Sequence, residues 1–186
     1  MANGRKPHMT GQESKELGQR LFEERQFAAA TRVLAEAVEH FPNDEPLWQE
    51  LVFSASQSEQ HESAVEFAKS AIRSHPRSGW LWRQLGKELT SVDRLDEAEK
   101  ALNNARTLLG HSDDWLWRYY AALHKKQKNL EREILAWENL HDFGYANSND
   151  LNSLGIAYHD HKNFAKALEF YRLSAATEPS VAPLFN

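Results

Sequence analysis

The sequence contains no cysteine, which excludes a disulfide framework and any metal site built from thiolates. It also lacks an apolar run of the roughly 18 residues that a membrane-spanning helix needs. Arg5 and Lys6 stand near the N-terminus, but no hydrophobic segment follows them, so no secretory signal is visible. We therefore expect a cytoplasmic protein that does not enter a membrane.

Glycine and proline are few, at 8 and 6 of 186 residues, and Val, Ile and Thr are sparse beside Ala, Leu and Glu. This composition favours helix over sheet throughout the chain. Hydrophobic residues make up 41% and charged residues 26%, which is typical of a soluble domain with one core. The net charge of -5 argues against a surface that binds phosphate backbones, so we expect no nucleic-acid partner.

Motifs for catalysis and cofactor binding are also missing. The chain has no G-x-S-x-G, no glycine-rich phosphate loop, no H-E-x-x-H and no cysteine nucleophile. The densest group of metal-ligand residue types is His159, Asp160 and His161, but neighbouring residues on a helix point in different directions. Zinc ligand sets usually include a wider-spaced pair. We therefore expect exposed turn histidines there, no metal, no cofactor and no enzymatic activity.

What the sequence does contain is a repeated pattern. The stretch WLWRQLG at Trp80–Gly86 recurs 35 residues later as WLWRYYA at Trp115–Ala121, and earlier in reduced form as LWQEL at Leu47–Leu51. Pro42 and Pro76 lie 34 residues apart. Large residues three or four positions apart form one stripe on a helix. The fixed long period therefore indicates stacked copies of one helical unit.

This pattern resembles the tetratricopeptide repeat (TPR), whose period of 34 carries W-x2-L-G-x2-Y, then A-x3-F, then P. The third copy shows it as Trp82, Leu85-Gly86, Leu89, Ala98, Leu102, Ala105 and Gly110. The resemblance covers five copies, about 11–44, 45–78, 79–113, 114–147 and 148–181. It implies an all-α fold, a right-handed superhelical solenoid of five antiparallel helix pairs.

The ends of the chain differ from the repeats. Residues 1–12 are polar and aperiodic, and we interpret them as a disordered lead-in to a TPR domain at 13–179. Residues 180–186, with Phe185 at the position of Trp82, resemble the opening of a further first helix. Because a solenoid needs a polar capping helix at its end, we expect a truncated further repeat or an end face that another molecule covers.

Each copy divides into two apolar-striped helices, for example Pro46–Ser56 and His61–Ser74, joined by a short polar break. Small residues such as Gly86 are expected where the paired backbones approach each other. Three serines stand just before first helices and are expected to cap them: Ser78, Ser112 and Ser148.

Four tryptophans occupy packing positions of the repeat and are expected in the core: Trp48, Trp82, Trp117 and Trp137. Trp80 and Trp115 differ, because each lies two residues before such a position. In the TPR proteins that this chain resembles, residues here line the inner concave face, where ligands bind. Arg83 and Arg118 share that face by the same resemblance.

Three lysines follow one and two turns later, at Lys87, Lys125 and Lys126. Stacked Trp with Arg suits an acidic or aromatic peptide, through charge-assisted bonds and cation–π contacts. We therefore predict a partner-binding groove at these two tryptophans, two arginines and three lysines. The alternative is that Trp80 and Trp115 shield a junction between repeats and that the cations are merely solvated.

TPR domains that hold the terminal carboxylate of chaperone tails use a Lys and Asn array in three successive copies. Lys15 matches that array, but Gln19 and Glu50 stand where it has asparagines, and Trp80 and Gln84 replace its two basic residues. We therefore expect no binding of chaperone tails by that mechanism.

Glu133 breaks the pattern, because the other four copies carry alanine at its position. An unpaired buried carboxylate is strongly destabilising. We therefore expect Glu133 to reach solvent or to meet a cation, and the fourth pair to pack more loosely.

These features favour a non-catalytic protein–protein interaction scaffold whose concave face holds a peptide or a segment of a partner. Two alternatives stay open. One is self-assembly into a homo-oligomer through the uncapped C-terminal end, and the other is a targeting or regulatory module for an enzymatic domain outside these residues.

Overall fold

The computed structural model describes residues 9–177, a range that contains ten α-helices and no strand. The helices are α1 (Gly11–Glu23), α2 (Phe27–His40), α3 (Glu45–Gln57), α4 (His61–Ser74), α5 (Gly79–Ser91), α6 (Leu95–Leu109), α7 (Asp114–Lys126), α8 (Leu130–Asp142), α9 (Ser148–Asp160) and α10 (Phe164–Thr177). The predicted all-α fold is confirmed. The predicted lead-in runs too far, because α1 already begins at Gly11. The predicted start of a further repeat at 180–186 lies outside the described residues.

The first helix of every pair is capped by the side chain of the residue before it. These residues are Thr10, Asp44, Ser78, Asp113 and Asn147. Each accepts a hydrogen bond from the backbone N–H three residues later, which satisfies one free donor of the first turn. The predicted cap at Ser78 is confirmed. The predicted caps at Ser112 and Ser148 are wrong by one residue, because the neighbouring Asp113 and Asn147 supply the acceptor.

The turn inside every pair contains one residue with a left-handed backbone. These residues are Arg25, Glu59, Asp93, Lys128 and Lys162, with φ between 57° and 62°. The residue after each one donates its backbone N–H to a carbonyl five residues back, at 2.8–2.9 Å. This bond closes the C-terminal end of the first helix and reverses the chain. The same turn therefore recurs every 34 or 35 residues without glycine.

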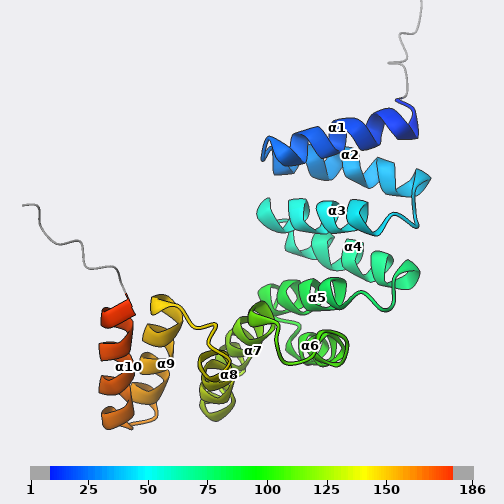
Figure 1. Cartoon of the computed structure of the whole chain (residues 1–186). Coiled ribbons are helices and arrows are strands. Elements are labelled where there is room, and N and C mark those ends of the chain that lie inside the picture. Colours follow the sequence, from blue (N-terminus) through cyan, green and yellow to red (C-terminus); the bar gives the residue numbers. More distant parts are fainter. Residues whose placement is uncertain (1–8, 178–186) are drawn as a thin grey trace, which may run out of the picture. The chain divides into compact units, whose positions relative to one another are not determined.

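The chain divides into two compact units, residues 1–108 and 109–186. In the first unit α1 packs on α2, α2 on α3, α3 on α4 and α4 on α5, as the stack in Figure 1 shows. The first helices of the pairs also contact one another, α1 with α3 and α3 with α5. They therefore form one continuous face, which we call the first-helix face of this unit.

Glycine sets the spacing where α1 crosses α2 and where α5 crosses α6. A Cβ atom on Gly18 would lie 2.6 Å from Leu34 Cδ2, and one on Gly86 would lie 2.5 Å from Leu102 Cδ2. Because close-packed interiors leave no room for such overlaps, a side chain at either position would have to displace the facing leucine or move the helices apart. The predicted close approach at Gly86 is thus confirmed.

Three tryptophans at packing positions also fix the loop before their helix. Each indole Nε1–H donates to the carbonyl six residues back, in the pairs Trp48 to Pro42 (2.9 Å), Trp82 to Pro76 (3.0 Å) and Trp117 to His111 (2.9 Å). Trp48 and Trp117 are buried, which confirms the prediction for those two, whereas Trp82 and Trp137 are only half-buried.

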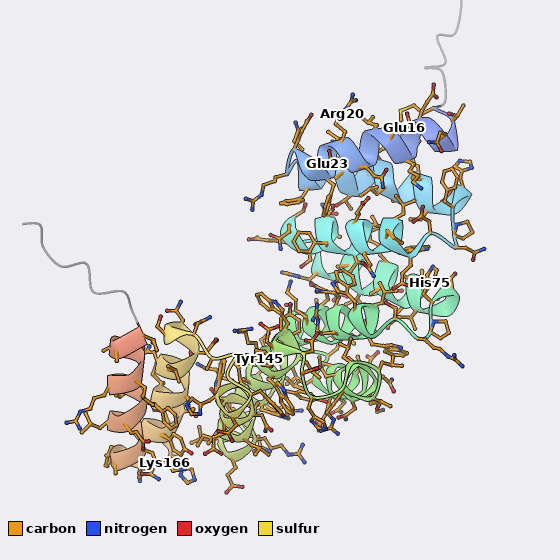
Figure 2. The ribbon with its side chains drawn as sticks, in the orientation of Figure 1. Glu16, Arg20, Glu23, His75, Tyr145 and Lys166 are labelled. Carbon is orange, nitrogen blue, oxygen red and sulfur yellow. The ribbon has the colours of Figure 1, made fainter. Side chains whose placement is uncertain are left out.

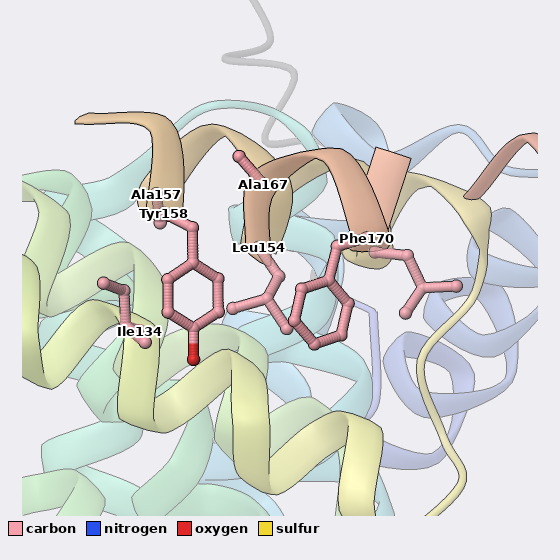
Figure 3. Packing of buried hydrophobic residues seen from close by; sticks show 7 residues of the cluster. Ile134, Leu154, Ala157, Tyr158, Ala167 and Phe170 are labelled. Atoms are coloured by element: carbon pink, nitrogen blue, oxygen red, sulfur yellow. The ribbon is translucent and has the colours of Figure 1, made fainter. Parts of the chain in front are cut away.

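In the second unit α7 packs on α8, α8 on α9 and α9 on α10. Its buried cluster comes from α8, α9 and α10: Ile134, Leu151, Leu154, Ala157, Tyr158, Ala167 and Phe170 (Figure 3). The rings of Tyr158 and Phe170 stack with centroids 5.6 Å apart. The Tyr158 hydroxyl contacts Glu138 on α8 and lies 2.6 Å from Lys166 Nζ on α10, so one polar contact joins all three helices.

The outer sides of α1 and α10 differ in polarity. Glu16, Arg20 and Glu23 are exposed on α1, and Figure 2 shows Glu16 and Arg20 projecting away from α2. On α10, by contrast, Leu168 is 49% exposed and Leu173 is 38% exposed.

Candidate partner-binding surface

The α5 part of the predicted site lies on the first-helix face of the first unit. Trp80, Arg83 and Lys87 stand three and four residues apart and therefore share one side of the helix. Trp80 and Lys87 are half-buried and Arg83 is buried. The Ser78 cap fixes where α5 begins and hence where Trp80 points.

Lys87 is engaged inside the unit. Its Nζ lies 2.5 Å from Ser56 Oγ on α3 and 3.1 Å from the carboxylate of Glu88. Glu88 is fully buried, and its other oxygen lies 2.7 Å from His61 Nδ1 on α4. Lys87 therefore ties α5 to α3, and part of its charge is neutralised by Glu88.

The same face carries a half-buried carboxylate on α3, that of Glu50. One oxygen of Glu50 lies 3.4 Å from Gln19 Nε2, and the other is buried without a hydrogen-bond partner. Burial raises the pKa of Glu50, and the contact with Gln19 only partly opposes this. Lys15 meanwhile pairs with Asp44 at 2.5 Å. At this position a terminal carboxylate would meet the carboxylate of Glu50 instead of an amide, and the absence of chaperone-tail binding stays a prediction.

The α7 part of the site lies in the second unit and centres on Trp115. Asp113 caps α7 by accepting from the Leu116 N–H at 2.8 Å. Trp115 is 50% exposed, more than any packing-position tryptophan. Its ring lies 5.1 Å from the guanidinium carbon of Arg118 and 5.9 Å from the ring of Tyr119. The three side chains form an exposed platform, which we call the Trp115 platform.

Arg118 also holds α9 in place. Its Nη2 donates to Asp150 Oδ2 at 2.8 Å and to the Tyr145 carbonyl at 3.2 Å, and its Nη1 pairs with Asp114. Burial opposes the charge of Arg118, but the hydrogen bonds with Asp150 and Asp114 outweigh burial and raise the pKa of the guanidinium. The positive charge is therefore already matched by two carboxylates, and Arg118 acts as a link between α7 and α9.

Lys125 and Lys126 are exposed in the last turn of α7. Ten residues of helix place Lys125 roughly 15 Å along the axis from Trp115. Glu133 is buried on α8, so of the two expected outcomes, exposure or a nearby cation, the structure excludes the first and favours the second, with Lys125 as the cation. Burial raises the pKa of Glu133, and the positive charge of Lys125 partly opposes this.

The structure thus brings Trp115 and Arg118 into contact and places Trp80, Arg83 and Lys87 on one side of α5. A single groove that joins the α5 and α7 residues stays a prediction. Phe53 escaped the sequence analysis, although it stands 34 residues before Lys87 and so shares its register on the first-helix face. Its ring lies 5.8 Å from each of two other half-buried rings, Phe22 and Phe27. Its position in the repeat, 34 residues before Lys87, would have been enough to predict that Phe53 lies on this face.

Among residues 9–177, no helix is long and apolar enough to cross a membrane. Within the same range, no three His, Cys, Asp or Glu side chains are grouped so that they could hold a metal ion. His159 is exposed and lies edge-on to Phe164, with its Nδ1 3.5 Å from Asp160. The predicted turn position of this group is what the structure shows, since α9 ends at Asp160.

Comparisons with known protein families and with curated protein sequences found no match. Solved structures do match. A fragment of MamA from Desulfovibrio magneticus RS-1 has a TM-score of 0.81 at 16% identity, over 92% of this chain and 97% of that one. PilF of Pseudomonas aeruginosa has a TM-score of 0.75 at 16% identity, over 91% of this chain and 77% of that one.

YrrB, described as a TPR protein with an unusual peptide-binding site, has a TM-score of 0.71 at 16% identity, over 92% of this chain and 88% of that one. Identities this low show a shared fold and nothing of shared ligands. The helix pairs, their common turn and these structural neighbours agree: the chain has the fold of the tetratricopeptide-repeat proteins.

Proposed function

We propose that this protein is a non-catalytic interaction scaffold that binds a peptide or an extended segment of a partner protein on its first helices. The observation that carries the proposal is the Trp115 platform. An aromatic ring that is half exposed, yet held by Arg118 and Tyr119, offers a rigid surface to a ligand. Rigid aromatic anchors are typical centres of protein–protein binding energy.

The chemistry of α7 defines the ligand. Arg118 is paired with Asp114 and Asp150, so it orients Trp115 and leaves the recognition of acidic groups to Lys125 and Lys126. An aromatic side chain would stack on Trp115, and an acidic side chain would meet the lysines roughly 15 Å away along the helix. An extended peptide covers that distance in about four or five residues. We propose a ligand with an aromatic and an acidic residue at that spacing.

On α5 the equivalent residues would make a second set of contacts with the same kind of segment. Trp80 is half-buried, which limits it to edge contacts, and Lys87 shares its charge with Glu88. We therefore assign the larger share of binding energy to Trp115 and a smaller share to Trp80, Arg83 and Lys87. The peptide-binding site named for YrrB, a structural neighbour, is compatible with this use of the fold.

A random peptide library displayed on phage and selected on the full chain tests the proposal. Enriched peptides should carry an aromatic and an acidic residue four or five positions apart. Binding of a synthesised peptide, measured by fluorescence anisotropy, should weaken by about tenfold for Trp115→Ala. Binding should weaken less for Lys125→Glu, and the difference between this variant and the wild type should become smaller at high salt.

Leu135→Ala is the matched control, because Leu135 on α8 is also exposed, at 57%, but lies on a second helix. Its binding should equal that of the wild type. Peptides that bind Trp115→Ala and Lys125→Glu as tightly as the wild type would reject the proposed surface. Circular dichroism checks that each variant keeps its helix content.

A further inference from the structure

The side of α10 that points away from α9 combines two leucines and two alanines with one Glu and one Arg. It forms a shallow depression of about 410 Å³ lined by Ala165, Leu168, Glu169, Arg172, Leu173 and Ala176. All six are exposed, whereas Ala167 and Phe170 on the opposite side of the helix are buried. We call these six residues the α10 face.

A further copy of the repeat would not account for this face. In the earlier second helices the position of Leu173 carries Glu36, Ser70, Asn104 and Asn139, and the position of Ala176 carries Glu39, Arg73, Thr107 and Asp142. These residues are polar, and none of them is buried. Only the position of Leu168 is one that neighbouring helices cover, as Val65 and Ile134 show. Leu173 and Ala176 are therefore apolar for another reason.

The face has an internal symmetry. Ala165 and Ala176, Leu168 and Leu173, and Glu169 and Arg172 lie at equal distances from the midpoint between residues 170 and 171. If a second α10 is placed antiparallel across a two-fold axis at that midpoint, each residue meets its counterpart. Alanine then meets alanine and each Glu169 meets an Arg172 of the other copy near the centre of the contact. Leu168 and Leu173, about 140° apart around the helix, lie along its two edges, each beside the same leucine of the other copy. A two-fold interface requires this kind of self-complementary surface.

We propose that two copies of this chain associate through their α10 faces, as antiparallel helices related by a two-fold axis. Glu169 and Arg172 lie between the two leucines, so the face carries one charge of each sign and is complementary in charge to a second copy of itself. Alanines at both ends allow the two backbones to approach closely. This association is independent of the peptide surface proposed on the first helices.

The contact is small. A helix of 14 residues spans roughly 21 Å, and one helix against its copy buries less than the approximately 1,200 Å² of a stable interface. We therefore expect a reversible dimer with a dissociation constant on the order of 100 μM. Sedimentation velocity of the full chain from about 10 μM to 1 mM should show the monomer giving way to a dimer.

Leu173→Glu, which restores the polar residue of the earlier copies, should weaken dimerisation by about tenfold or more. Leu135→Glu places the same charge at an exposed leucine of α8 and should leave dimerisation unchanged. Glu169→Arg and Arg172→Glu should each weaken the dimer, and the double variant should restore it. Circular dichroism distinguishes loss of association from loss of folding.

Because the chain has no cysteine, disulfide cross-linking can report the direction of the helices. A mixture of Ala165→Cys and Ala176→Cys chains should form the mixed disulfide, and neither variant alone should cross-link efficiently. Cross-linking of each variant with itself would indicate parallel helices and overturn the proposal. A monomer up to 1 mM would overturn it too, and dimerisation that then appears in Phe185→Asp would identify residues 178–186 of the same chain as the occupant.

Discussion

Replacement of Arg118 by alanine separates a linking role from a direct ligand-binding role. The change removes the contacts to Asp150 and Asp114, the bond to the Tyr145 carbonyl and the cation over Trp115. The side chains of Arg118 and Asp150 are only 16% and 8% exposed, so solvent cannot replace the lost partner fully. Asp150 still accepts the N–H of Asn147 at 3.0 Å, which limits the loss.

From these contacts we expect Arg118→Ala to lower the free energy of unfolding by about 2–3 kcal/mol. Arg118→Lys keeps the charge but cannot make the forked contacts, and it should lose about half as much. Asp150→Asn keeps one oxygen for the N–H of Asn147, but it removes the charge and one of the two oxygens that accept from Arg118. In a double-mutant cycle, the loss for Arg118→Ala with Asp150→Asn should fall short of the sum of the single losses by about 1 kcal/mol. Urea unfolding followed by circular dichroism measures all four proteins.

The ligand provides the second half of this test. If Arg118 recognised acidic peptides directly, Asp150→Asn would release its charge and strengthen binding. If Arg118 orients Trp115, Asp150→Asn should weaken binding or leave it unchanged. An Arg118→Ala protein within about 0.5 kcal/mol of wild-type stability would refute the linking role, whatever happens to binding.

Three other substitutions test the packing. Gly86→Ala adds a Cβ 2.5 Å from Leu102 and should destabilise the protein by about 1–3 kcal/mol, although alanine has the better helix propensity. Adding Leu102→Ala should restore part of this loss. Thermal melts of the single and the double variant measure both effects. Glu133→Ala should stabilise the protein by about 1 kcal/mol at pH 7. Because burial raises the pKa of Glu133 in the folded state, wild-type stability falls as the pH rises through that pKa, so this gain should shrink towards pH 4 in parallel urea titrations. Trp48→Phe loses the bond to the Pro42 carbonyl and should reduce stability by about 1–2 kcal/mol in urea unfolding.

The helices could be predicted because the period is long and the apolar stripe is regular. The expected helix His61–Ser74 is α4 as observed, and the expected Pro46–Ser56 is α3 less one residue at each end. The capping residues could also have been predicted from the sequence. The capping residues lie 34 or 35 residues apart: Thr10, Asp44, Ser78, Asp113 and Asn147. Counting from Ser78 by the repeat period therefore finds the other caps, whereas looking for serine does not.

Other features could not be read from one sequence. Four of the five left-handed turn residues are Arg, Glu or Lys, which have no preference for that backbone, and only Asp93 is of a type that favours it. The hydrogen bonds of the folded turn are therefore needed to identify them. The pairing of Arg118 with Asp150 joins residues 32 apart in the sequence, and the sequence around either residue does not indicate its partner. The predicted acidic preference of the site counted Arg118 among five basic residues, and its pairing with Asp114 and Asp150 leaves less of that charge for a ligand.

A repeat fixes some positions and leaves others to vary, and this difference locates function. At positions that neighbouring helices cover, such as those of Leu34 and Leu102, packing determines which residue fits. Trp115 and Leu173 lie at exposed positions, where no packing contact requires an apolar side chain and a polar residue is more usual. Large apolar side chains at such positions lower solubility without stabilising the pair that carries them. Exposure alone does not identify such a contact, because Leu135 is 57% exposed and belongs to neither proposed surface. We propose the contacts at Trp115 and Leu173 from their neighbours, and substitutions there should change binding while leaving unfolding nearly unaltered.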